Sequence, residues 1–224
     1  MLDSDDIWLP SKLEQQVAIL NAVPEAGAVY GRTQTWKSWD TASRGAGKDR
    51  TGPLYVKLNR VYRAGSLLAR VIRGKIAIPS TSNICFRREL IKRIGEFERS
   101  FVGMYEDQVF LAKVFLKEAV LVSGECWDRY RIHPDSCTAV ALRQGLLGPT
   151  HRAYLNWVEQ YLREQGEQGT SAWRAVQVAL YPYRHPGFAP FLKYADAIFI
   201  KIRSLTSRLR EALGRDKPHL IQQR

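Results

Sequence analysis

Residues 1–20 read MLDSDDIWLPSKLEQQVAIL, and the stretch begins with an unusual concentration of acid. Three carboxylates stand close together there: Asp3, Asp5 and Asp6. Ser11 and Glu14 have the spacing of a capping box, and apolar residues then recur at helical intervals, which predicts a helix over residues 12–21. Clustered carboxylates repel one another unless a cation such as Mg²⁺ or Mn²⁺ neutralises them. A solvated acidic turn in front of a helix gives the same pattern, so both interpretations stay open at this point.

The composition is that of a globular and strongly basic protein. Its 224 residues are 45% hydrophobic, enough for one substantial core, with or without a helical appendage. Lys and Arg number 34 against 22 Asp and Glu, and the formal charge of +12 favours anionic partners such as nucleic acid, anionic lipid or nucleotide diphosphates. The three cysteines show no C-x-x-C spacing, which argues against a disulfide framework and a zinc ribbon and favours a cytoplasmic location.

Strand and helix patterns both occur behind the opening segment. The expected strands are residues 28–36, 82–88, 119–124 and 127–133. The expected helices are residues 54–73, 88–95, 106–118, 150–166 and 191–213. A loop rich in Gly, Ser and charge is expected between residues 36 and 53.

Two acids, Glu106 and Asp107, open the helix expected over residues 106–118. The helix dipole favours negative charge in a first turn, so their placement needs no special chemistry. About 100 positions separate them from the opening acids, and only tertiary folding can bring the two groups together. The sequence therefore raises a spatial question that it does not answer.

Three segments resemble family-2 glycosyltransferases with the GT-A fold. LDSDDIWLPSKLEQQV resembles the D-x-D region of that family, in which clustered aspartates follow an apolar strand and precede an amphipathic helix. IPSTSNICFRRELIKRIGEFERSFVGMYEDQVFLAKVF resembles its acceptor region, and YRIHPDSCTA resembles its closing segment. The segments follow the family's order and cover residues 1 to 139.

The resemblance implies an α/β protein that transfers a sugar, with inversion, from a nucleotide-sugar donor to a glycan or a lipid-linked acceptor. Asp5 and Asp6 are then the ligands of Mg²⁺ or Mn²⁺, which stabilises the negative charge that develops on the leaving diphosphate. Asp3 contacts the donor or supports the turn. Asp107 is the base that deprotonates the acceptor hydroxyl, with Glu106 beside it as an acceptor contact or a helix cap.

Three further residues are candidates for the same site. His133 stands where the family often has a histidine that approaches the metal or diphosphate, although a histidine beside a proline is commonly structural. Arg131 alternates with Arg129 on an expected strand and can meet phosphate, or it is ordinary surface charge. Trp36, close to Trp39, can stack on a sugar, or it anchors the loop.

The resemblance also implies a division of the chain. Residues 1–145 match the metal and acceptor half of an incomplete GT-A domain that lacks its first strands, and residues 146–224 form a helical extension. We therefore expect this chain alone to transfer sugar weakly or not at all. Either the start site is misplaced, the gene is a fragment, or a separate N-terminal half is supplied by a partner chain. Residues 198–224 carry a basic amphipathic pattern that suits the inner face of the cell membrane or packing on the domain itself.

Two other interpretations compete with sugar transfer. A basic protein that binds nucleic acid or a membrane surface would explain the charge, but the chain has no RNP motif or zinc finger, so we expect no nucleic-acid partner. A non-catalytic remnant of a glycosyltransferase would explain the missing strands. Retention of Asp107 and of the opening acids argues against the remnant.

Overall fold

The computed structural model describes residues 1–40 and 48–188. Contacts divide the chain into two units, Met1–Leu180 and Tyr181–Arg224. The second unit is described only by the end of one helix and a short 3-10 turn, Pro186–Phe188. The helix expected at residues 191–213 and the segment 198–224 expected at a membrane lie outside the described residues.

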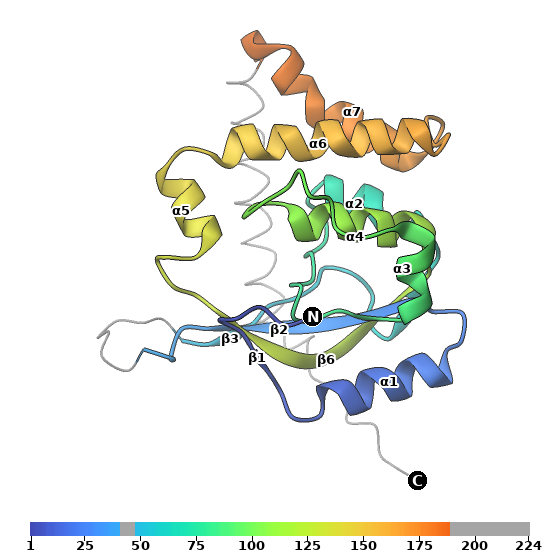
Figure 1. The fold of residues 1–224 in the computed structure, drawn as a ribbon, viewed down its shortest axis with the longest axis vertical. Coiled ribbons are helices and arrows are strands. Elements are labelled where there is room, and N and C mark those ends of the chain that lie inside the picture. Colours follow the sequence, from blue (N-terminus) through green and yellow to red (C-terminus); the bar gives the residue numbers. More distant parts are fainter. Residues whose placement is uncertain (41–47, 189–224) are drawn as a thin grey trace, which may run out of the picture. The chain divides into compact units, whose positions relative to one another are not determined.

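Six strands of the described chain form one mixed sheet, which confirms the α/β class (Figure 1). The strands are β1 Ile7–Trp8, β2 Ala28–Trp36, β3 Arg50–Thr51, β4 Arg60–Tyr62, β5 Cys85–Phe86 and β6 Val120–Arg131. The central order is β1-β6-β2-β3, with β4 paired to β6 and β5 to β2. β2 and β6 run parallel, and the other pairs run antiparallel.

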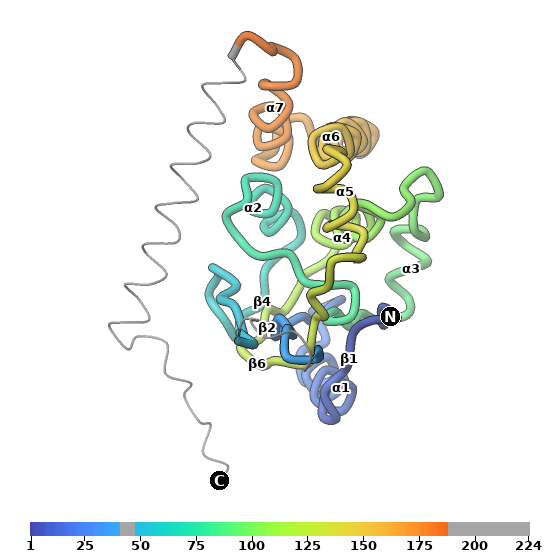
Figure 2. Tube along the Cα trace, turned by 90° about the vertical axis from the view of Figure 1, so that its left-hand side faces the viewer, coloured from blue at the N-terminus to red at the C-terminus, as the bar shows by residue number. Residues whose placement is uncertain are grey.

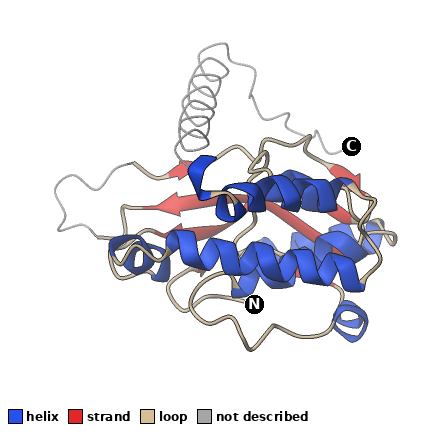
Figure 3. Ribbon diagram, turned by 90° about the horizontal axis from the view of Figure 1, so that it is seen from above, coloured by secondary structure: helices blue, strands red, loops and turns tan. Residues whose placement is uncertain are grey.

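Helices cover both faces of this sheet. They are α1 Lys12–Ala22, α2 Leu68–Ile72, α3 Arg88–Ile94, α4 Glu106–Lys117, α5 Cys137–Arg143, α6 Leu147–Glu164 and α7 Ser171–Arg184. α1 lies on one face, α2 and α4 lie on the other, and α6 packs beyond α4 (Figures 1 and 2). Figure 3 shows the helices stacked over the strands. Within the described ranges, no helix has the length and apolar character needed to cross a membrane.

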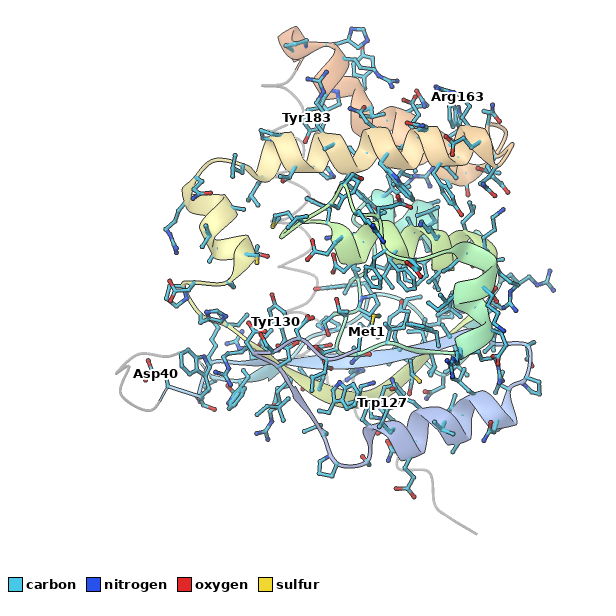
Figure 4. All side chains as sticks on the ribbon, viewed as in Figure 1. Met1, Asp40, Trp127, Tyr130, Arg163 and Tyr183 are labelled. Atoms are coloured by element: carbon cyan, nitrogen blue, oxygen red, sulfur yellow. The ribbon has the colours of Figure 1, made fainter. Side chains whose placement is uncertain are left out.

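The sheet separates two apolar layers. On the α1 side, Trp127 is fully buried with Leu20 and Val29, and its indole Nε1 donates to Gln15 at 2.7 Å (Figure 4). On the other side the rings of Tyr30 and Phe115 lie 6.2 Å apart between β2 and α4. The alternation of side chains along β2 and β6 thus supplies a core to each face.

The buried face of α1 is polar, contrary to its apolar pattern. Leu13 and Val17 are about half exposed, whereas Lys12 and Gln16 are buried and both donate to the backbone carbonyl of Asn83, at 3.0 and 2.8 Å. Burial lowers the pKa of Lys12, whose ammonium also lies 4.9 Å from the centre of a neighbouring indole ring. α1 therefore docks through hydrogen bonds as well as apolar contact.

Asn83 connects this helix to the sheet. Its side-chain oxygen accepts a hydrogen bond from Gly31 N at 2.7 Å, and its amide nitrogen donates to the carboxylate of Asp128. Asn83, Asp128 and the amide of Gln16 are all buried, so each polar atom needs a partner inside the protein. The network satisfies these atoms where the chain bulges between β2 and β6.

Four expected elements are confirmed and three expectations are wrong. The structure confirms α1, β2, α3 and α4. The capping box is wrong, because the Ser11 side chain makes no capping hydrogen bond. Residues 54–67 are not helical: β4 pairs there with β6, and Tyr55 and Asn59 have positive φ. The strands expected at 119–124 and 127–133 are one bulged strand, β6.

The structure also adds to the expected organisation. α5 was not expected, and α6 begins three residues before the expected helix. The division at Leu180 differs from the expected boundary at residues 145 and 146, because α6 packs on α4 within the first unit.

Gly31→Ala is expected to destabilise the protein strongly. A Cβ at this position would lie 2.4 Å from the carbonyl oxygen of Glu125 and 2.9 Å from the Trp127 ring, and neither can move freely. We expect a loss of about 3 kcal/mol in the free energy of unfolding, measured by urea denaturation. Gly52→Ala is the matched control, since a Cβ there meets nothing within 4 Å. Equal stability of the two variants would contradict this account of the bulge.

Candidate functional site

The opening acids form a turn that is tied to the sheet by Asp6. Asp6 N donates to Asp3 O at 3.2 Å, which closes the turn. The carboxylate of Asp6 is buried and accepts from Ser82 Oγ at 2.7 Å and from Arg131 N at 3.1 Å. Ser82 Oγ in turn accepts from Asp3 N at 3.1 Å. Both carboxylate oxygens of Asp6 thus serve the fold, while Asp3 and Asp5 lie nearer the surface.

Asp5 pairs with His133 across the sheet edge. Asp5 Oδ2 lies 2.8 Å from His133 Nε2, and the side chains retain 40% and 19% of their exposure. The His133 ring meets the Trp39 ring edge to face, with 6.4 Å between centroids. An oxygen and a nitrogen ligand therefore stand side by side at an accessible position.

Arg131 lies between two indole rings. Its guanidinium carbon is 5.0 Å from the centroid of Trp36 and 5.1 Å from that of Trp39, distances typical of cation–π contacts. Trp39 is anchored by a hydrogen bond from its Nε1 to Ile132 O at 2.9 Å. The Arg131 Nε is buried without a hydrogen-bond partner. This stack fixes a cation next to the Asp5–His133 pair.

The second acidic group begins α4 from a strained position. Tyr105 precedes the helix in the left-handed region, with φ 69°, which is uncommon for a bulky residue. Glu106 Oε2 is buried without a partner, and Asp107 Oδ1 accepts from Gln108 N at 2.7 Å. Burial raises the pKa of Asp107 from 3.8 to about 6, and the nearby Glu106 and Asp3 charges add to the rise.

The structure brings the two acidic groups together. The charges of Asp5 and Glu106 help to raise the pKa of Asp3, although burial is the larger cause. Tyr130 lies on the face of the sheet that looks toward α4 (Figure 4). Burial raises the pKa of its phenol, and the charges of four acids raise it further: Asp6, Asp5, Asp3 and Asp107. Tyr130 therefore lies among all of these carboxylates.

The sequence analysis did not single out Tyr130, Ser82 or the aromatic residues beside Asp107. Tyr105 stacks on Tyr154 of α6, with ring centroids 5.0 Å apart and an interplanar angle of 17°. The Tyr154 hydroxyl is buried without a hydrogen-bond partner. A signal existed only for Tyr130, which alternates with Arg129 and Arg131 and so faces the other side of the strand.

Some of the side-chain oxygen atoms at the site suit a hard divalent cation as ligands, and others do not. No group of three or more His, Cys, Asp or Glu in residues 1–40 and 48–188 is arranged to hold a metal. Mg²⁺ commonly takes one or two carboxylates and completes its shell with water and substrate phosphate. Asp5 supplies one such carboxylate, and a bound ion would replace the hydrogen bond between its Oδ2 and His133 Nε2. Asp6 does not fit, because Ser82 and Arg131 already occupy both of its oxygens.

No protein-family model matches the sequence, and no curated protein matches it. The function is therefore argued from the arrangement of side chains at the site.

Asp107→Asn is expected to stabilise the protein at about pH 8. The raised pKa means that the folded chain binds this proton more tightly than the unfolded chain, so ionisation above about pH 6 lowers the free energy of unfolding. A rise of about two pKa units sets an upper bound of about 3 kcal/mol for the gain. At about pH 4 the gain should shrink below about 1 kcal/mol. Urea unfolding at both pH values measures it.

Glu89→Gln is the control for this measurement. Glu89 is an exposed acid in the first turn of α3, and its replacement should change stability by less than about 0.5 kcal/mol at either pH. A gain from Asp107→Asn that is the same at both pH values would contradict burial as its cause.

Proposed function

We propose that this protein is a metal-dependent, inverting glycosyltransferase of the GT-A type, acting on a nucleotide-sugar donor. One observation carries the proposal: the acids of the opening turn and the acids that begin α4 interact electrostatically around Tyr130. The order of the three motifs that resemble family 2 supports the same reaction. The α/β architecture, with helices on both faces of a mixed sheet, is compatible with the GT-A fold.

Asp107 is the general base in this proposal. Its pKa of about 6 leaves it largely ionised near neutral pH and still basic enough to accept a proton. The acceptor hydroxyl gives its proton to the Asp107 carboxylate as its oxygen forms a bond to the anomeric carbon of the donor. The bond from that carbon to the diphosphate oxygen breaks with its electron pair on the diphosphate. Attack opposite the leaving group inverts the anomeric centre.

Asp5, His133 and Arg131 bind the diphosphate side of the donor. Asp5 and His133 would hold Mg²⁺ or Mn²⁺, which supplies charge stabilisation for the leaving diphosphate. Arg131 adds a cation whose orientation the indoles of Trp36 and Trp39 fix. Among the opening acids, Asp3 is the one whose charge acts on Asp107, and in this proposal it contacts the donor sugar or ribose. Asp6 supports this side by fixing the turn.

The three cysteines are free thiols, in keeping with a reducing cytoplasm. The acceptor is a glycan or a lipid-linked saccharide in this proposal.

Asp107→Asn is expected to lower kcat/KM for sugar transfer by about 10³-fold, because the amide cannot accept the acceptor proton. The kcat/KM of the unmodified chain should rise with pH through about 6 and level off above it, as the base ionises. Release of nucleoside diphosphate from a panel of nucleotide sugars, with Mn²⁺ and acceptor present, measures both. Glu89→Gln should leave the rate unchanged. Equal rates for Asp107→Asn and the unmodified chain would refute the base assignment.

Asp5→Asn is expected to weaken the binding of nucleoside diphosphate in the presence of Mn²⁺ by about 10- to 100-fold. Without Mn²⁺ the two proteins should bind the nucleotide equally weakly, because the carboxylate acts through the ion. Titration calorimetry with UDP and GDP measures the affinities without any turnover. Glu14→Gln, an exposed acid on α1, is the control. A nucleotide affinity that changes neither with Mn²⁺ nor with the Asp5→Asn substitution would contradict the proposed donor site.

A further inference from the structure

A groove of about 700 Å³ opens beside the acids that begin α4. Residues 100–104 form one wall, and α5 and α6 form the others (Figure 1). Two of its lining residues stand next to parts of the candidate site: Met104 precedes Tyr105 and the α4 acids, and Asp135 follows His133 by two positions. The groove therefore adjoins both the proposed base and the proposed donor side.

The helix α6 connects the groove directly to the base. Thr150 and Ala153 line the groove, while Tyr154, next in the chain, stacks on Tyr105 at 5.0 Å. Tyr105 in turn sets the backbone from which Asp107 projects two residues later. A molecule seated in the groove would thus lie against the same helix turn that supports the base.

The lining of the groove is mostly apolar, and it includes two aromatic rings and three amides. Trp157 and Phe101 both line it, and the two rings meet edge to face with 6.5 Å between centroids. Three amide side chains accompany these rings: Gln144, Asn156 and Gln160. A pyranose ring has C–H groups on its faces and hydroxyl groups around its edge. Aromatic faces with amide donors and acceptors beside them match both kinds of group.

The charge of the groove differs sharply from that of the chain. Among the described residues that line it, Asp135 alone is charged, and none is Lys or Arg. The chain as a whole carries a formal charge of +12. Sites for phosphate or carboxylate groups use Arg and Lys, because charge-assisted hydrogen bonds offset the loss of hydration. A groove without such residues on so basic a protein disfavours an anionic ligand.

We propose that this groove binds the non-reacting part of an uncharged glycan acceptor, with one sugar ring packed against the Trp157 and Phe101 rings. Tyr161 is already stacked on one face of Trp157, with 5.0 Å between centroids, so the sugar meets the remaining part of the indole. The inference rests on the proposed function, since it takes the groove as the acceptor side of that site. It selects a neutral glycan over a lipid-linked diphosphate or an acidic polysaccharide. The amides of Asn156 and Gln160, both exposed on α6, then bind hydroxyl groups at the rim.

The test is binding of the full chain to a glycan array that carries neutral and acidic oligosaccharides, without donor or metal. We expect neutral oligosaccharides to bind and Trp157→Ala to weaken that binding at least about 10-fold, as loss of a contacting ring does. The double variant Asn156→Ala/Gln160→Ala alters only exposed amides, so it should fold normally and weaken binding about 5-fold or more. Trp173→Ala, an indole on α7 outside the groove lining, is the matched control and should bind like the unmodified chain.

Three results would overturn the proposal. They are the absence of binding to any neutral glycan, neutral binding that survives both groove variants, and acidic binding that the groove variants abolish. Because no donor, metal or turnover is involved, glycan binding can persist when sugar transfer is absent. In that case the proposed function fails and the groove assignment stands. Sugar transfer without groove-dependent glycan binding would instead overturn the groove assignment and leave the proposed function standing.

Discussion

The buried amide and carbonyl of Asn83 are the interaction on which the rest of this structure depends. Asn83 bonds to Gly31 of β2 opposite the bulge of β6, to a buried carboxylate on β6 and to two polar side chains of α1. Each of these groups would be costly to bury alone, and together they satisfy one another. The adjacent Ser82 continues the network to Asp6, so the opening turn is fixed by the same loop that joins helix to sheet.

This anchoring explains how like charges can gather at one end of the sheet. Burial raises the pKa of the Tyr130 phenol, and the charges of four nearby carboxylates raise it further. Asp6 accepts two hydrogen bonds that offset part of its own burial. Asp5 shares a hydrogen bond with His133, while the acids of α4 begin a helix whose dipole favours negative charge. Carboxylates that the surrounding structure holds close together despite their repulsion are typical of sites that bind a cation or move a proton.

The sequence predicted local elements well where periodicity and end signals agreed. The helix before Gly95 ended as expected, since Gly95 adopts a positive φ of 80°. The helix prediction for residues 54–67 was wrong. Leu54, Leu58 and Val61 lie at helical spacing, but pairing with β6 decides the structure there. α1 was predicted, but its docked face was not, because burial of Lys12 and Gln16 depends on Asn83, about 70 positions away.

The candidate site could be predicted only as two separate acidic groups. Their meeting depends on pairing between β2 and β6 and on hydrogen bonds that span most of the chain, such as those joining Asp6 to Ser82 and to Arg131. Resemblance supplied the residues, and tertiary structure supplied their proximity. The roles of Tyr105 and Tyr154 had no local signal, because each depends on a neighbour from another element.

The pairing of β1 with the end of β6 has a kinetic consequence. Residues 7 and 8 find their partners only at residues 128 and 129, so the contact closes a very long loop. Contacts of such high sequence separation form slowly and late, since chain entropy opposes them until other structure has brought the ends near. During synthesis the acidic turn must therefore wait for more than half of the polypeptide to emerge.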